Sequence, residues 1–273
     1  MIMTRSQSTL TYENNENNSS ENIHTTGYQV IRSAVTIDDR ILKSAQRLGE
    51  KKAGAIFNHN EVNTRNDYKR LQCNLPLKAK YMRSFNTSVQ KIVKNKINTN
   101  LLPTDPVIIY SKSGCQPQAA HCDYIPDQAL KTVDDAQMPL AILIALMPDT
   151  HLNVWPNSIR LATAKPEQLK SINPIPCETI DLNSGDMLVF RGDFVHAGSG
   201  YQADNYRIHY YLDSPKVPRT ANRTWLIPKN QNDPLRKIIQ PSIQNGQSFF
   251  SKQASRKRKN QCKAASYKIM KPG

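Results

Sequence analysis

Short runs of β-branched, aromatic and aliphatic residues fill the stretch from Pro106 to Asp213, and Gly, Pro, Asn and Asp separate them. Such runs are typical of β-strands bounded by turns. They are PVIIYS, PLAILIALM, HLNVW, CETIDL, DMLVF and YRIHYYL. PLAILIALM is apolar throughout and predicts a central strand. CETIDL alternates between polar and apolar residues and predicts a strand with one solvent-exposed face. Together the runs predict a mainly β fold with flanking helices, a double-sheet jelly roll.

Two helices are predicted before these strands. The first has Thr36 at its N-cap, Asp38 and Asp39 in its first turn, and Gly54 beyond its end. The second has an apolar stripe at helical spacing, formed by Leu77, Tyr81, Phe85, Val89 and Ile92. Because this stripe must pack on something, we expect the helices to cover one sheet of the jelly roll.

Composition and charge divide the chain into four segments. Residues 1–30 are polar and predicted to be disordered. Residues 31–104 form a helical accessory segment packed on the core, 105–228 form the jelly-roll core, and 229–273 form an irregular basic tail. The net charge is +15, yet Ser214 to Gly273 holds 14 Lys or Arg and one acid, Asp233. A near-neutral body with such a tail predicts polyanion contact through the tail; a targeting signal and a merely solvated tail are the alternatives.

The sequence also bears on the compartment. No apolar run approaches the ~20 residues of a membrane-spanning helix, and the polar start lacks the apolar segment of a secretory signal. The five cysteines form no CxxC pair and are odd in number, which favours neither a zinc knuckle nor a disulfide framework. We therefore expect an intracellular protein, cytoplasmic or nuclear, with reduced thiols and no membrane partner.

A candidate metal site lies within the predicted strands. His121 and Asp123 in AAHCDY are two residues apart, so both face one side of a strand while Cys122 faces the other. Two imidazoles and one carboxylate are the ligand set of non-haem Fe(II) centres, which leave positions open for a chelating cosubstrate and O₂. His196 follows a later run and supplies the third ligand. Arg207, on the next run, offers a planar charged group to the distal carboxylate of 2-oxoglutarate.

These motifs resemble those of the 2-oxoglutarate/Fe(II)-dependent dioxygenase superfamily, and within it the phytanoyl-CoA dioxygenase type. The resemblance rests on GCQPQAAHCDY, WPNS, GDMLVFRGDFVHAG and YRIHYYL, and it covers roughly residues 105 to 213. It implies a cupin-like double-stranded β-helix, Fe(II) on His121, Asp123 and His196, and 2-oxoglutarate held by Arg207. His209 stands where such enzymes often keep a second group for the cosubstrate carboxylate. The implied activity is O₂-dependent hydroxylation of an unidentified organic or macromolecular substrate.

Two positions depart from the family's pattern. The turn Asn157-Ser158-Ile159 stands where the family usually has Gly-Ser-His. Asp213 stands where the alkylation-repair branch carries a second arginine, which argues against nucleobase demethylation.

Further residues are candidates for the pocket wall, with ordinary strand packing as the alternative for each: Gln118, Tyr110, Tyr124 and Trp155. Two other functions remain open at this point. A jelly roll that binds metal without catalysis predicts metal binding but no consumption of 2-oxoglutarate. A nucleic-acid-binding protein that acts through its basic tail predicts salt-sensitive binding that is lost when residues 251–273 are removed.

Overall fold

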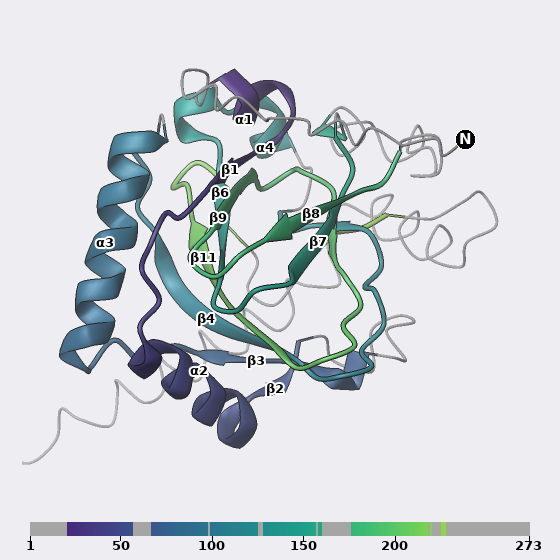
Figure 1. Cartoon of the computed structure of the whole chain (residues 1–273). Helices are drawn as coiled ribbons and strands as arrows, with labels where there is room; N and C mark the ends of the chain where they lie inside the picture. The colour runs from purple at the N-terminus through teal and green to yellow at the C-terminus, as the bar shows by residue number, and fades with distance from the viewer. Residues whose placement is uncertain are drawn as a thin grey trace, which may run out of the picture.

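The computed structural model describes residues 21–56, 67–97, 99–124, 128–156, 158–159, 176–217, 219 and 225–227. Two antiparallel sheets dominate it and face one another as a double-stranded β-helix (Figure 1). The larger sheet has the strand order β1-β9-β6-β11-β4-β3-β2, and the smaller sheet has the order β12-β5-β10-β7-β8. The predicted jelly roll is confirmed.

The elements have the following bounds. The larger sheet consists of β1 (Tyr28–Ile31), β2 (Gly54–Ala55), β3 (Arg70–Asn74), β4 (Thr104–Ser111), β6 (Leu140–Ala145), β9 (Met187–Arg191) and β11 (Asn205–Leu212). The smaller sheet consists of β5 (His121–Cys122), β7 (Thr150–Val154), β8 (Glu178–Leu182), β10 (His196–Gly198) and β12 (Trp225–Leu226). The helices are α1 (Glu21–Thr25), α2 (Asp39–Lys52), α3 (Lys80–Lys96) and α4 (Gln128–Thr132), with short 3-10 turns at Asp67–Lys69 and Asp135–Gln137.

β6 lies between β9 and β11 in the larger sheet, and all of its residues are buried. Its side chains alternate between the two faces of the sheet. Leu143 and Ala145 join the apolar core between the two sheets, whereas Ile142 and Ile144 join the core beneath the helices. The run PLAILIALM is therefore a central strand, as predicted. The run CETIDL forms the edge strand β8, and its exposed residues give the expected wet face.

The helices α2 and α3 cover the outer face of the larger sheet. α2 contacts β3, β4 and β11. Phe85 and Val89 of α3 belong to the same apolar core as Ile108 of β4. Flanking helices on one sheet were predicted, and the structure confirms them (Figure 1).

The start of α2 differs from the prediction. Its N-cap is Asp38, whose carboxylate accepts hydrogen bonds from the backbone N–H groups of Arg40 (2.9 Å) and Ile41 (3.1 Å). Thr36 was predicted as the N-cap, but it lies two residues too early in the chain to reach these N–H groups. An acceptor at the N-cap stabilises a helix by about 0.5–2 kcal/mol, and Asp38 supplies it.

The buried stripe of α3 is rotated slightly from the predicted one. Phe85 and Val89 are buried as expected, whereas Tyr81 and Ile92 are half-buried at the margin of the stripe. The stripe consists of Met82, Phe85, Val89 and Val93. Tyr81 and Ile92 lie eight residues before and three after Val89, whereas Met82 and Val93 lie seven before and four after it. All of these steps return to nearly the same side of a helix, so the sequence pattern fitted both stripes.

The N-terminal segments hold more structure than predicted. Residues 1–30 were predicted to be disordered, but α1 and most of β1 lie within 21–30, and Ile23 is buried. Residues 31–104 were predicted to be helical, but β2 and β3 join the larger sheet from there. Residues 1–20 and the predicted tail at 229–273 lie outside the described residues. Within the described part, no helix is both long and apolar enough to span a membrane.

The turn before β9 ties the N-terminal segment to the sheet. The Asp186 carboxylate accepts hydrogen bonds from the backbone N–H groups of Ser33 (2.8 Å) and Asn183 (2.9 Å) and from the Arg32 guanidinium (2.8 Å). Burial by itself raises the pKa of Asp186, but these hydrogen bonds outweigh it, and the net pKa is lowered. Asp186 is therefore ionised in the folded protein and stabilises this junction.

Candidate metal centre

Three potential metal ligands meet between the two sheets. His121 opens β5 and His196 opens β10, and the two residues are direct partners in the antiparallel pairing of these strands. Asp123 directly follows β5 and faces the same side as His121 because it lies two residues further on. One ligand atom from each of the three lies within 4.8 Å of the others, and all three residues are buried. The structure thus brings together the three residues that the sequence analysis proposed as ligands.

A backbone carbonyl group orients each histidine. The His121 Nδ1 atom lies 2.8 Å from the Ala119 carbonyl oxygen, and the His196 Nδ1 atom lies 3.1 Å from that of Phe194. Because a carbonyl oxygen can only accept, Nδ1 of each ring donates to it, and Nε2 is the ring atom that can bind a metal. Contacts of this kind hold imidazole ligands in place in metal sites.

The protonation states also suit metal binding. Burial, and secondarily the nearby His121, lower the pKa of His196 to about 3, so its ring is neutral at pH 7. Burial by itself raises the pKa of Asp123, but the neighbouring His196 and His209 outweigh it, and the net pKa is lowered. A neutral imidazole and an ionised carboxylate are the forms that bind a metal ion.

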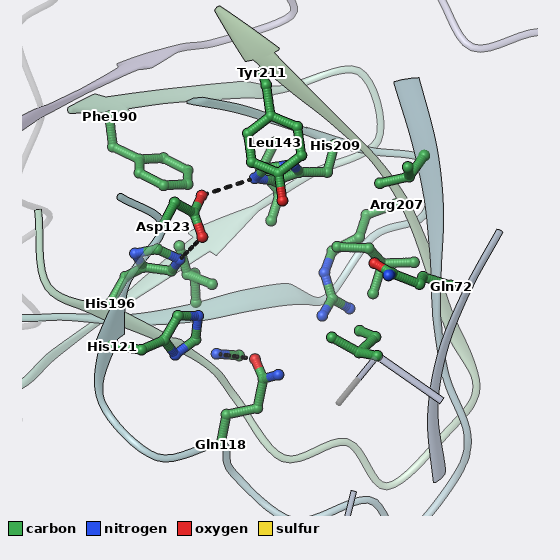
Figure 2. Close-up of a pocket in the computed structure, with 15 residues that line it drawn as sticks. Gln72, Gln118, His121, Asp123, Leu143, Phe190, His196, Arg207, His209 and Tyr211 are labelled. Atoms are coloured by element: carbon green, nitrogen blue, oxygen red, sulfur yellow. Dashed lines mark hydrogen bonds and ion pairs between the residues drawn. The ribbon is translucent and has the colours of Figure 1, made fainter. Parts of the chain in front are cut away.

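The Asp123 carboxylate lies between two histidines. Its Oδ1 is 3.7 Å from the Nε2 atom of His196, and its Oδ2 is 3.4 Å from the Nε2 atom of His209 (Figure 2). Oδ2 is buried and makes no hydrogen bond of normal geometry with any described residue. A buried carboxylate oxygen in this state suits a cation, and two imidazoles with one carboxylate suit Fe(II). The residues therefore fit the metal that the motif implied.

Arg207 points into the same space from the opposite side (Figure 2). It lies on β11, is 2% exposed, and donates a hydrogen bond to the Ser111 hydroxyl (2.9 Å). A buried guanidinium has a fixed charge and a fork geometry that match a carboxylate. His209, which was expected to contact the cosubstrate, lines the same cavity beside Asp123.

A second buried arginine was missed by the sequence analysis. Arg70 of β3 is fully buried and donates to the Ser111 hydroxyl (3.0 Å) and to the carbonyl oxygens of Ser199 (2.7 Å) and Gln116 (3.1 Å). The Ser111 hydroxyl thus accepts hydrogen bonds from two guanidinium groups, those of Arg70 and Arg207. Arg70 directly follows the half-buried Lys69, and no local pattern separates the fully buried cation from this neighbour.

One cavity of about 70 Å³ connects the three ligands with Arg207. It has room for a few water-sized groups. Gln118 lies in its wall, where the side-chain oxygen accepts a hydrogen bond from the Gly198 N–H (2.8 Å) and the Gln118 N–H donates to the Gly198 carbonyl (2.9 Å). Apolar side chains form much of the remaining wall: Ile56, Val107, Ile109, Leu143, Leu152 and Phe190.

Three residues expected in the pocket wall lie elsewhere. Tyr110 stacks on Tyr206 with ring centres 4.4 Å apart, because strand alternation turns it away from the inward-facing side of β4. Tyr124 is buried and donates its hydroxyl to the Asp213 carboxylate. Trp155 is half-buried after β7. None of the three lines the described cavity, and their place in a substrate pocket stays a prediction.

Tyr211 is a wall residue that the sequence analysis missed. It follows Arg207 and His209 on the inward side of β11, and its hydroxyl points into the cavity (Figure 2). The Arg219 guanidinium lies 3.7 Å above the centre of its ring. Asp213 holds that guanidinium through both carboxylate oxygens, at 2.8 and 3.1 Å. Extending the two-residue period from Arg207 along the strand identifies Tyr211.

The turn that departs from the family's pattern supports the third ligand. Ser158 is fully buried, and its hydroxyl accepts a hydrogen bond from the Val195 N–H (3.0 Å), immediately before His196. The turn therefore holds the beginning of β10, although its sequence is not the usual one.

Comparisons with known proteins agree with this architecture. No protein-family model matches the chain, and no curated protein matches it in sequence. Solved structures do match. The non-heme alpha ketoglutarate dependent epimerase SnoN from nogalamycin biosynthesis is 16% identical, with a TM-score of 0.54 over 70% of this chain and 80% of that chain. The carbocyclase SnoK from the same biosynthesis is 14% identical, with a TM-score of 0.55 over 72% and 85%.

A third solved structure, HygX from Streptomyces hygroscopicus with nickel and 2-oxoglutarate bound, is 12% identical, with a TM-score of 0.50 over 70% of this chain and 84% of that chain. At such low identities the likeness establishes the fold. The chain therefore has the double-stranded β-helix of these proteins, and its chemistry has to be argued from its own residues.

Proposed function

We propose that the chain is an Fe(II)- and 2-oxoglutarate-dependent oxygenase, and more specifically a hydroxylase. The observation that carries this proposal is a single cavity with two imidazoles and a carboxylate at one side and the buried Arg207 guanidinium at the other. Bound Fe(II), with 2-oxoglutarate and O₂, would supply oxidation of a C–H bond, while the cosubstrate is converted to succinate and CO₂. Support also comes from SnoN, SnoK and HygX, whose names or ligands refer to the same cosubstrate.

The protein's own groups would hold and shield the reactants. His121, Asp123 and His196 would bind the metal, with Asp123 ionised and His196 neutral. Arg207 would pair with the distal carboxylate of 2-oxoglutarate. The apolar wall would keep water from the reacting centre.

The finer assignments belong to the same proposal. We propose kinship with the phytanoyl-CoA dioxygenase type, an intracellular location, and an organic or macromolecular substrate. The proposed catalytic unit is 105–228, and β1, β2 and β3 from the preceding segments complete its larger sheet. The basic tail is proposed as a polyanion contact.

Anaerobic titration of the purified protein with Fe(II) and then 2-oxoglutarate tests the assignment. We expect a weak visible charge-transfer band when the cosubstrate chelates the metal. His121→Ala should abolish metal binding. His151→Ala is the matched control, because His151 pairs with Asp181 at the surface and should leave binding unchanged. Arg207→Ala should bind Fe(II) normally but require more 2-oxoglutarate to form the band.

The alternatives give different results. A non-catalytic metal-binding jelly roll would bind Fe(II) and form no band with 2-oxoglutarate. An Arg207→Ala protein with wild-type affinity for 2-oxoglutarate would contradict the role of Arg207 and leave the metal site intact. A protein that acts solely through its tail would retain its activity after His121→Ala.

A further inference from the structure

The outer face of α3 is strongly basic and has no acidic residue. Its exposed side chains include four cations that recur along the helix. These are Lys80, Arg83, Lys91 and Lys94. Steps of three and eleven residues return to nearly the same side of an α-helix, so the four cations form one ridge. Lys80 and Lys91 are separated by about 17 Å along the helix axis, at 1.5 Å per residue.

Among the described residues, the positive charge is concentrated in the segment that contains α3. Residues 67–97 carry eight Lys or Arg and one acid, whereas the remaining described residues carry twelve Lys or Arg and fifteen acids. An ordinary solvated helix mixes both signs of charge. A basic ridge on an otherwise slightly acidic body produces a local positive potential that attracts polyanions.

No described acidic side chain neutralises the ridge. Among the described residues, none of the four cations forms an ion pair, and Arg83 donates a hydrogen bond to the backbone carbonyl of Lys78. Elsewhere in the described chain, ion pairs do form, as between Lys43 and Asp39 on α2 (3.5 Å). Within the described structure, the charge of the ridge is therefore available to a partner.

The opposite face of α3 is occupied by the core. The side chains of Phe85 and Val89, which form the apolar face of α3, are buried in the core. The helix therefore has no apolar face left to insert into a lipid surface. Figure 1 shows α3 at the margin of the described structure, beside the larger sheet, with no labelled element outside it. The partner must therefore be recognised by charge and hydrogen bonding.

We propose that this ridge binds the phosphate backbone of double-stranded nucleic acid. Lysine and arginine neutralise phosphates, and the exposed Ser84, Thr87, Ser88 and Asn95 between them are residue types that donate hydrogen bonds to phosphate oxygens. A single strand would be held by exposed aromatic rings on which bases stack, and the outer face of α3 has none in the described structure. The contact is independent of sequence, and it does not require the nucleic acid to be the substrate.

Salt-dependent binding to a 24-base-pair mixed-sequence DNA duplex tests the proposal. Each phosphate that a side chain neutralises contributes about −0.9 to the slope of log K against log salt concentration. The full-length variant with Lys80, Arg83, Lys91 and Lys94 all changed to Gln should therefore lose about 3.6 from the wild-type slope. The basic tail is present in both proteins, so its contribution cancels.

A matched control removes the same charge from another helix. It carries the substitutions Lys43→Gln, Arg47→Gln, Lys51→Gln and Lys52→Gln on α2, where all four side chains are exposed. We expect its slope to change by less than about 1. An equal loss of slope in both variants would mean that the effect depends on the net charge and not on the position of the cations, and it would overturn the proposal.

Three other outcomes would also overturn it: no binding of the duplex by the wild-type protein, tighter binding to anionic phospholipid vesicles than to the duplex, or tighter binding to a single strand of the same length. Circular dichroism checks that each variant folds. If the fourfold α3 variant does not fold, two double variants replace it: Lys80→Gln/Arg83→Gln and Lys91→Gln/Lys94→Gln. Each should lose about 1.8 from the slope. An unchanged slope in both would refute the proposal.

Discussion

Removal of one hydroxyl group should disturb two buried cations at once. Ser111 is fully buried, and its hydroxyl accepts hydrogen bonds from Arg70 (3.0 Å) and Arg207 (2.9 Å). A hydrogen bond to a charged group contributes about 1.5–3 kcal/mol to stability, so the loss of both gives a range of about 3–6 kcal/mol. Because Arg70 keeps its bonds to two carbonyl oxygens, we expect Ser111→Ala to lower the free energy of unfolding by about 3 kcal/mol.

Urea unfolding followed by circular dichroism measures this loss, and the melting temperature should fall by about 6–12 °C. Ser158→Ala is the matched control, because Ser158 is equally buried but accepts one hydrogen bond from an uncharged backbone N–H. We expect it to cost about 1 kcal/mol. If Ser111→Ala costs no more than Ser158→Ala, the reasoning that one hydroxyl supports two guanidinium groups is refuted. The affinity for 2-oxoglutarate should fall as well, because Arg207 loses an orienting contact.

Other substitutions test the packing around the sheets. Gly27→Ala should destabilise the fold by about 1–3 kcal/mol in urea unfolding, because the φ angle of Gly27 is +92° and a Cβ atom there would lie 2.4 Å from the Phe194 ring. The control Gly54→Ala should cost less than about 1 kcal/mol, because the space around Gly54 is open. Phe85→Ala should cost about 3–5 kcal/mol, because Phe85 is buried beneath α3, and a smaller loss would indicate that the helix packs loosely. The folded-state pKa of Asp186 is lowered, so its contribution to stability is present above the unfolded-state pKa near 3.9 and disappears as the pH falls through the folded-state value. Asp186→Asn should be less stable than wild type at pH 7 and should lose less stability than wild type during acid titration below about pH 4.

The alternation of side chains along a strand made much of the site predictable. It placed His121 and Asp123 on one side of β5, and it explains why Arg207 and His209 line the same cavity. Tyr211 obeys the same rule, so the signal for it was present. Tyr110 has the opposite phase along β4, and the same rule turns it out of the cavity.

Contacts between distant strands could not be read from the chain. Ser111 and Arg70 are 41 residues apart and meet because β3 and β4 are paired. Nothing in the local sequence distinguishes Ser111 from other serines at strand ends. Likewise, α1 and β1 lie in a stretch with few apolar residues, and their order depends on the sheet and the turn at Asp186 that receive them. Local composition therefore underestimated the structure at the N-terminus.

The pairing of β12 with β5 has a consequence for how the protein is made. Leu226 is paired with His121, and Trp225 with Cys122, so the strand that carries the first ligand is covered on one edge by a much later part of the chain. During synthesis on the ribosome, His121 and Asp123 emerge well before this cover does. A nascent chain that stops short of Trp225 exposes the backbone of β5 to neighbouring chains. We therefore expect the metal centre to be assembled late, after nearly all of the β-domain has left the ribosome.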